Sequence, residues 1–366
     1  MGLLMTMNPL GLKEIHHVEF WVGNAKQAAF FFRNAFGFSG KAYRGLETNE
    51  RNYSSHVISQ NEAIFVFTSP LNSSGPINDH LNLHGDGVRD IAFHVEDADH
   101  AYHHAIAQGA VGETEPHEVE DEYGHIRRAA IRTYGDTIHS LISYEDYSGP
   151  FLPGYQPQVI PGTSCGIQRV DHIVGNVELG KMNHWADWYS NVMGFERYIS
   201  FDDKDISTEY SALMSIVMSD NSYSIKFPIN EPAEGRRKSQ IDEYLEYYNG
   251  PGVQHLAMLT DDILETVRSL RERGVEFLSV PESYYQNLPG RIGEIDETIK
   301  AIADLGILAD RDEDGYLLQL FTKPVQDRPT VFFELIQRKG SRGFGKGNFK
   351  ALFEAIEHEQ SLRGNL

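Results

Sequence analysis

Cysteine is almost absent from this chain, and its absence excludes several classes of protein. The 366 residues contain one cysteine, Cys165, so neither an intramolecular disulfide framework nor a thiolate-rich zinc or iron–sulfur site can form. No apolar run approaches the roughly 20 residues that a membrane-spanning helix needs. The first 15 residues lack the basic start and the small-residue cleavage site of a secretory signal. We therefore expect a protein of a reducing, cytoplasmic compartment with no membrane partner.

Basic residues are also scarce. The chain has 32 lysines and arginines against 53 acidic residues, which gives a formal net charge of -21. This excess opposes nonspecific binding to nucleic acid or anionic lipid, because both require a basic surface. With 40% hydrophobic and 23% charged residues, the composition is that of a globular protein. The length exceeds the roughly 100 to 200 residues of one compact domain, which favours two domains.

Two sequence patterns each occur twice along the chain. The first is a short apolar segment with a histidine, followed by a helical stretch that ends at glycine. The second is a strand that begins Gly-Val and leads through an aspartate, Asp97 or Asp261, which is expected to cap a helix that again ends at glycine. The copies span residues 15–37 and 170–194 for the first pattern, and residues 87–109 and 252–274 for the second.

Each copy continues into alternating apolar segments typical of strands, for example residues 64–67 and 317–321. The chain therefore contains four βαβββ units, two in each half. Residues 148–162 are rich in proline and glycine and are interpreted as a linker. The predicted fold class is α+β, with domains 1–160 and 161–366, each an open barrel-like sheet of paired βαβββ units.

Superposing the repeats shows three candidate metal ligands in the second half. All three lie on strand-like segments, where side chains of one parity can point into a shared concavity. Two histidines and one carboxylate leave three positions of an octahedral ion open, as in non-heme Fe(II) oxygenases. The first half retains a single histidine and one aspartate, which suggests a lost metal site. The superposed pairs are His172 with His17, His255 with Asp90, and Glu334 with Ser140.

Spacing alone does not separate these ligands from ordinary buried polar residues. The surrounding motifs, however, resemble the 4-hydroxyphenylpyruvate dioxygenase family of the vicinal-oxygen-chelate superfamily, over roughly residues 165–360. The first half matches that family in its repeat pattern and in residues 85–88. The motifs include Pro-Ile-Asn-Glu-Pro at 228–232, Gly-Val-Gln-His at 252–255, Leu-Gln-Leu-Phe-Thr-Lys-Pro at 318–324 and Gly-Phe-Gly-Lys-Gly-Asn-Phe at 343–349.

The resemblance implies a specific reaction and cofactor. One Fe(II) per chain would be held by His172, His255 and Glu334, with the 2-oxo acid group of 4-hydroxyphenylpyruvate at two of the open positions and dioxygen at the third. Oxidative decarboxylation, ring hydroxylation and side-chain migration would give homogentisate and CO2, a step of tyrosine and phenylalanine catabolism. Members of the family are often dimers or tetramers, so a homo-oligomer is implied.

The same resemblance assigns roles to residues around the iron. Gln240, Gln254 and Gln319 correspond to glutamines that hydrogen-bond near the iron and the phenol, and a neutral amide can do so without competing for the metal. Substrate-binding residues complete the predicted site. They are Ser215 and Asn230, close to the substrate, and Phe321, Phe344 and Phe349, which would clasp its ring.

The C-terminal segment suggests a gate. Residues 340–346 nearly spell a nucleotide-binding P-loop, but Gly347 replaces the hydroxyl residue that would hold Mg²⁺, so ATP binding is rejected. A glycine hinge followed by an amphipathic helix at 348–362, capped by Asn348, fits better. A histidine group on another expected helix is interpreted as solvated surface rather than as a metal patch; it comprises His100, His103 and His104.

Two alternatives remain open. 4-Hydroxymandelate synthase shares the ligands and the substrate but hydroxylates the benzylic carbon, and the neighbourhoods of Asn230 and of Ser239-Gln240 favour the ring-hydroxylating branch. A non-catalytic small-molecule-binding protein of the same fold is the alternative of another class. Retention of all three ligands argues against it.

Overall fold

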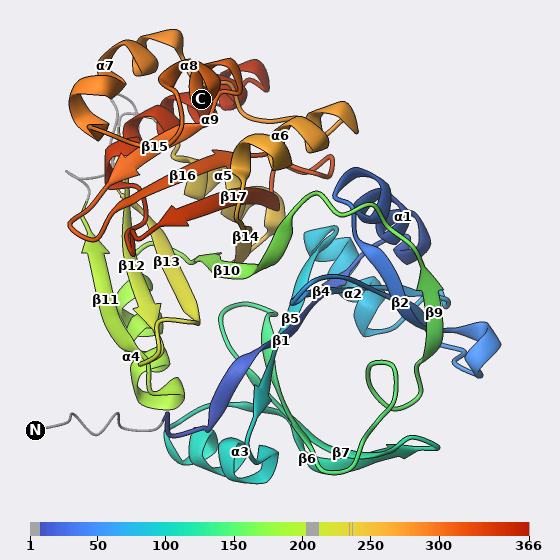
Figure 1. Cartoon of the computed structure of the whole chain (residues 1–366). Helices are drawn as coiled ribbons and strands as arrows, with labels where there is room; N and C mark the ends of the chain where they lie inside the picture. Colours follow the sequence, from blue (N-terminus) through green and yellow to red (C-terminus); the bar gives the residue numbers. More distant parts are fainter. Residues whose placement is uncertain (1–7, 203–211, 234, 236, 366) are drawn as a thin grey trace, which may run out of the picture.

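The chain folds into two curled sheets, each flanked by helices (Figure 1). The computed structural model describes residues 8–202, 212–233, 235 and 237–365. Within these residues no helix is both long enough and apolar enough to cross a membrane.

The first half forms a nine-stranded sheet in the order β6-β7-β8-β5-β1-β4-β3-β2-β9. Its strands are β1 (Leu12–Trp21), β2 (Ser39–Arg44), β3 (Tyr53–Gln60), β4 (Ala63–Pro70), β5 (Gly87–Val95), β6 (Gly112–Asp121), β7 (Gly124–Arg132), β8 (Ile138–Tyr144) and β9 (Gln156–Ile160). Its helices are α1 (Ala25–Ala35), α2 (Pro76–His84) and α3 (Ala98–Ala107), with a 3-10 turn η1 (Leu46–Thr48).

The second half forms an eight-stranded sheet in the order β11-β12-β13-β10-β14-β17-β16-β15. Its strands are β10 (Ile167–Asn176), β11 (Glu196–Phe201), β12 (Ala212–Ser219), β13 (Lys226–Ala233), β14 (Gly252–Thr260), β15 (Leu308–Arg311), β16 (Tyr316–Phe321) and β17 (Phe332–Lys339). Its helices are α4 (Met182–Met193), α5 (Gln240–Tyr248), α6 (Ile263–Glu272), α7 (Glu282–Ile292), α8 (Ile299–Asp304) and α9 (Phe349–Leu362), with a 3-10 turn η2 (Lys346–Asn348).

The predicted repeat is confirmed, because the two sheets share one topology. In each, the first strands of the paired units run antiparallel at the centre, β1 with β5 and β10 with β14. A parallel strand flanks each side, β4 and β8 in the first sheet, β13 and β17 in the second. The fourth unit differs by the insertion of α7 and α8 between its helix and its last three strands.

Two local expectations need correction. Part of the segment predicted as a linker forms β9, which pairs with β2 and extends the first sheet as far as Ile160. Asp262, not Asp261, caps α6: its backbone is extended and its side chain accepts from the Glu265 amide, as Asp97 does for α3. With two adjacent aspartates, the residue in the extended conformation takes the cap.

One hydrophobic core joins the two halves. Ile173, Leu256 and Phe333 of the second sheet belong to the same buried cluster as Val18 and many other side chains of the first. The Phe333 ring centroid lies 5.2 Å from that of Phe32 on α1. Because side chains alternate along a strand, burying these residues in the shared core turns their neighbours toward the opposite, concave face of the sheet.

Candidate metal centre

Three neighbouring strands carry the predicted ligands on that concave face. His172 lies on β10, His255 on β14 and Glu334 on β17, each one residue away from the core residues Ile173, Leu256 and Phe333. The Oε2 atom of Glu334 lies 3.2 Å from Nε2 of His172 and 3.4 Å from Nε2 of His255. All three side chains are buried, and their ligand atoms lie within 4.8 Å of one another.

The hydrogen bonds behind the ligands leave both Nε2 atoms available to a metal. His172 Nδ1 donates to Asp171 Oδ2 at 2.8 Å, and His255 Nδ1 donates to the amide oxygen of Gln254 at 3.0 Å. A proton held on Nδ1 places the lone pair of a neutral ring on Nε2. Two imidazoles and one carboxylate therefore converge. Glu334 and Asp171 raise the pKa of His172 despite its burial, so a metal ion at Nε2 would replace a proton that the carboxylates favour there. The residues present fit a borderline divalent ion.

Electrostatics also favour an anionic Glu334. Burial by itself raises the pKa of this carboxyl group, but the adjacent His172 and His255 outweigh burial and lower the pKa to about 2. Burial lowers the pKa of His255, and the carboxylate only partly opposes this effect. The site thus supplies one negative charge and an uncharged imidazole toward a cation.

A buried ion network holds His172 in place. Arg338 forms two hydrogen bonds to Asp171, of 2.9 and 2.8 Å, and Lys226 Nζ lies 3.6 Å from the same carboxylate. Burial opposes ionisation of Asp171, but its contacts with His172 and Arg338 hold its pKa well below the usual value. The carboxylate therefore stays ionised and orients the imidazole.

A chain of amides links Glu334 to the start of α9. Gln319 Nε2 donates to Glu334 Oε1 at 2.9 Å, and Asn348 Nδ2 donates to Gln319 Oε1 at 2.8 Å. Tyr284 OH donates in turn to Asn348 Oδ1 at 2.6 Å. Asn348 is the N-cap residue of α9, as predicted, but its side chain makes no capping bond to the helix and is used in this chain of amides instead.

Gly345 permits the close approach on which this chain of amides depends. Its backbone is left-handed, with φ of +72°, and a Cβ added there would lie 1.9 Å from Gln319 Oε1. Only glycine accommodates both the conformation and the contact. The glycine segment predicted as a hinge thus also allows the Gln319 amide to reach the candidate ligand Glu334.

All the residues that the sequence predicts for the site line one pocket. The ring of Phe344 lies 5.0 Å from that of His172, and Phe321 meets His255 edge-on at 5.9 Å. The apolar face of α9 closes one side, as its spacing predicted, through Phe349, Leu352, Phe353 and Ile356. The predicted residues in the lining are His172, Ser215, Asn230, Gln240, Gln254, His255, Gln319, Phe321, Glu334, Phe344 and Phe349.

The sequence interpretation missed Asp171, Arg338 and the second role of Asn348. Asp171 could have been found, because it directly precedes a proposed ligand. Arg338 and Asn348 are far away in sequence and carried no such signal. The histidines of α3 behave as surface residues, as expected: His100 contacts the Pro9 carbonyl and His103 the Asp99 carbonyl.

The first sheet holds different chemistry at the equivalent place. The strand registers align Asp90 with His255 and Ser140 with Glu334, in agreement with the sequence superposition. Asp90 accepts from both the amide and the hydroxyl of Ser140, and Arg128 lies 3.6 Å from its carboxylate. A guanidinium therefore supplies the positive charge in this sheet.

Comparison with known proteins agrees with this geometry. Residues 6–150 match the family described as hydroxyphenylpyruvate dioxygenase, N-terminal, and residues 169–320 match the glyoxalase, bleomycin resistance protein and dioxygenase superfamily. Among solved structures, a triple mutant of 4-hydroxymandelate synthase from Streptomyces coelicolor aligns with a TM-score of 0.87 and 33% identity, over 96% of this chain and 99% of that one.

Relatives of known name align over nearly the full length. The 4-hydroxyphenylpyruvate dioxygenase of Dictyostelium discoideum is 49% identical over 362 residues, which cover 96% of this chain and 99% of that protein. That of Xenopus tropicalis is 50% identical over 363 residues, which cover 96% and 92%. Identity at this level, over 96% of the chain, leads to one conclusion: the chain belongs to the 4-hydroxyphenylpyruvate dioxygenase family.

Proposed function

We propose that this chain converts 4-hydroxyphenylpyruvate and O2 into homogentisate and CO2, with one Fe(II) held by His172, His255 and Glu334. The observation that carries the proposal is the convergence of these three side chains, within 4.8 Å of one another, in a pocket walled by aromatic residues. Bound Fe(II) would supply the electrons and the open positions that dioxygen and a 2-oxo acid require.

The protein groups around the metal orient the substrate and exclude water. Asn230 on β13 and Ser215 on β12 are paired across the two strands and face the pocket, where they can hydrogen-bond to polar groups of the substrate. Gln240, Gln254 and Gln319 offer amides that can donate to a carboxylate, ketone or phenol without adding charge. Phe321, Phe344 and Phe349 provide the apolar walls for the substrate ring.

Helix α9 serves as the gate of this pocket. Its apolar face lines the cavity, and the glycine-rich segment 343–347 that precedes it supplies the hinge. The Asn348–Gln319 hydrogen bond joins the gate to the metal ligand Glu334. Closure of the gate would therefore be coupled to the position of the carboxylate that holds the metal.

The two halves have different roles in this proposal. Residues 161–366 form the catalytic domain, and residues 1–160 form a domain that has lost its metal site and serves structure and oligomerisation. The chain forms a homo-oligomer, a dimer or a tetramer, as members of the family often do. A cytoplasmic location is supported by the single, buried Cys165, since a reducing compartment needs no disulfides.

The second candidate is 4-hydroxymandelate synthase activity, favoured by the structural neighbour of that name. Both reactions consume the same substrate and release CO2, so only the product separates them. The test is to incubate the iron-loaded chain with 4-hydroxyphenylpyruvate and O2 and to identify the product by mass spectrometry and chromatography. Homogentisate supports ring hydroxylation, whereas 4-hydroxymandelate overturns it. The Glu334→Gln variant, which should form neither product, is the control.

A further inference from the structure

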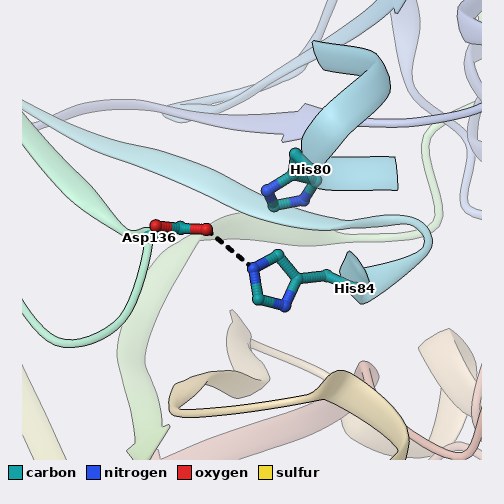
Figure 2. A group of neighbouring side chains, drawn as sticks. All are labelled: His80, His84 and Asp136. Carbon is teal, nitrogen blue, oxygen red and sulfur yellow. Dashed lines mark hydrogen bonds and ion pairs between the residues drawn. The ribbon is translucent and has the colours of Figure 1, made fainter. Parts of the chain in front are cut away.

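A second cluster of metal-ligating side chains lies at the junction of the two halves, away from the pocket. His80 and His84 are one turn apart on α2, so they share a face of the helix, and Asp136 approaches from the turn between β7 and β8 (Figure 2). Both histidines are buried, with 3% and 2% of their surfaces exposed. One ligand atom from each of the three residues lies within 4.8 Å of the others.

The contacts of His84 require a positive charge between its ring and Asp136. Its Nδ1 contacts the backbone carbonyl of Tyr248, which can only accept, so Nδ1 carries the proton. In a neutral ring, Nε2 then presents a lone pair to Asp136 Oδ2, 2.9 Å away. Two acceptors facing each other at this distance repel, unless a second proton on the ring or a metal ion supplies positive charge between them.

His80 distinguishes between those two possibilities. Neither of its ring nitrogens has a hydrogen-bond partner in the described part of the chain, although both are buried. Its ring centroid lies 4.8 Å from that of His84 and meets Trp21 edge-on at 5.3 Å. A proton on His84 would satisfy the His84–Asp136 contact but would leave His80 without a partner. A metal ion would use all three residues, and buried polar groups rarely stay unused.

The neighbouring Arg89 makes no hydrogen bond to the Asp136 carboxylate among the described residues, although its charge helps to lower the pKa of that group. Arg89 donates a hydrogen bond to Glu113 at 2.6 Å, and its guanidinium lies 4.8 Å from the Trp21 ring centroid. Toward Asp136 it reaches only the backbone carbonyl, which leaves the carboxylate to His84. The Asp136 side chain is 51% exposed, which provides a path by which an ion can enter.

We propose that His80, His84 and Asp136 form a second metal site that binds one borderline divalent ion of the Zn²⁺ class in a structural role. Two imidazoles and a carboxylate suit Zn²⁺ better than Mg²⁺ or Ca²⁺, which prefer oxygen ligands alone. The contact of the His84 Nδ1–H with a backbone carbonyl is the outer hydrogen bond that ligating histidines usually make.

The position of the site gives it a structural role. The carbonyl that His84 contacts belongs to Tyr248, the last residue of α5 in the second half. Arg328 and Asn249, also of the second half, donate to the carbonyl of Leu83, the neighbour of His84, at 2.7 and 3.4 Å. Four residues after Tyr248, β14 begins and carries Gln254 and His255 to the catalytic pocket. A metal here would tie the first half to the segment that delivers a catalytic ligand.

The test is to strip the full-length chain of metal with a chelator and titrate it with Zn²⁺ alone against a chromophoric competitor. The wild type should bind two equivalents, one at each histidine–carboxylate site. His80→Ala and Asp136→Asn should each weaken one equivalent by about tenfold or more, as expected for the loss of a donor. Glu334→Gln should lose the other equivalent, and Glu334→Gln combined with Asp136→Asn should bind none tightly.

A matched control is available on α3. His100 and His104 have the same spacing as His80 and His84, but no carboxylate joins them in a described metal-ligating group. His104→Ala should therefore keep both equivalents. If His80→Ala misfolds, the Asp136→Asn variant still tests the proposal, because the Asp136 side chain is half-exposed and its substitution should not disturb folding. One equivalent in the wild type, or two undiminished equivalents in Asp136→Asn, would mean that His84 and Asp136 form an ordinary ion pair and would overturn the proposal.

Discussion

The two sheets of this dioxygenase present the same backbone positions with opposite electrostatics. In the second sheet, His172 and His255 lower the pKa of Glu334 to about 2, and the carboxylate faces the pocket with Oε2 toward both imidazoles. In the first sheet, burial raises the pKa of Asp90 despite the nearby Arg128, and both carboxylate oxygens are used by Ser140. The fold supplies the place for a metal, and the side chains decide whether it is used.

One exchange between the sheets is especially informative. The registers place Arg128 of β7 opposite Ile142 and Gln319 of β16 opposite Ile336, so the two side chains occupy equivalent positions. The neutral Gln319 donates to Glu334 without opposing a metal. The guanidinium of Arg128 brings a permanent positive charge to the same position, which repels a divalent ion. The first sheet therefore opposes a metal at this place both through its missing ligands and through the charge of Arg128.

The largest effect is expected for Glu334→Gln. It removes the only anionic ligand of this site from a divalent ion, so metal binding at the pocket should fail and turnover should fall by about 1000-fold, or about 4 kcal/mol. The equivalent change in the first sheet, Ser140→Ala, should leave turnover within about twofold, because no metal is held there. Steady-state oxygen consumption measures both. Equal losses in the two variants would break the comparison.

Deletion of the residues after Gly343 should be the next most damaging change. It removes Phe344, Phe349 and the rest of α9 from the pocket, so water can enter and turnover should fall below about 1%. Metal binding should survive, because all three ligands lie on strands outside the deleted segment. Single-turnover assays and metal analysis are the measurements. Full activity in the truncated chain would refute the gate.

An intermediate effect on metal affinity is expected when the positive charge of Arg128 is introduced at the equivalent position of the second sheet. Gln319→Arg should weaken metal binding by about 100-fold or more, since a guanidinium at this position repels a divalent ion by several kcal/mol at an effective dielectric constant near 20. Arg128→Gln, the reverse change, should not create a metal site in the first sheet, because Ser140 offers no carboxylate. Metal titrations test both variants. An unchanged affinity in Gln319→Arg would show that charge at this position is irrelevant.

The smallest change is expected for the group behind the first ligand. Asp171→Asn keeps the shape but removes the charge that orients His172, and such substitutions typically lower metal affinity by about tenfold or more. At the equivalent position the first sheet has His16, and His16→Asn should leave metal affinity unaltered. Titration with Fe(II) under argon gives both affinities. A loss in His16→Asn as large as that in Asp171→Asn would contradict the assignment of the site to one sheet.

The repeat and the local sequence predicted the framework of this site, and the family resemblance assigned the roles of its residues. The internal repeat identified the four βαβββ units, and strand alternation placed His172, His255 and Glu334 on one face. Strand alternation can be recognised in the sequence because it depends on residues within a few positions of each other. The apolar face of α9 could be predicted for the same reason, because it depends on residues three and four positions apart.

Contacts between distant segments could not be predicted. The ion pair of Arg338 with Asp171 joins residues 167 positions apart, and the Asn348–Gln319 bond depends on how the glycine segment folds back. The metal-ligating group at the domain junction needed the structure as well. The sequence drew attention to the histidines of α3, whereas Asp136 makes the pair His80 and His84 the relevant one.

The most direct test of the account is anaerobic titration of the metal-free chain with Fe(II) in the presence of 4-hydroxyphenylpyruvate. A 2-oxo acid bound to Fe(II) through two oxygens gives a visible charge-transfer band, which should grow in the wild type and saturate at one equivalent of iron at the Glu334 site. Ser140→Ala should give the same band, and Glu334→Gln should give none. A colourless wild type, or a band of full intensity in Glu334→Gln, would contradict the claim that the second sheet holds the catalytic metal.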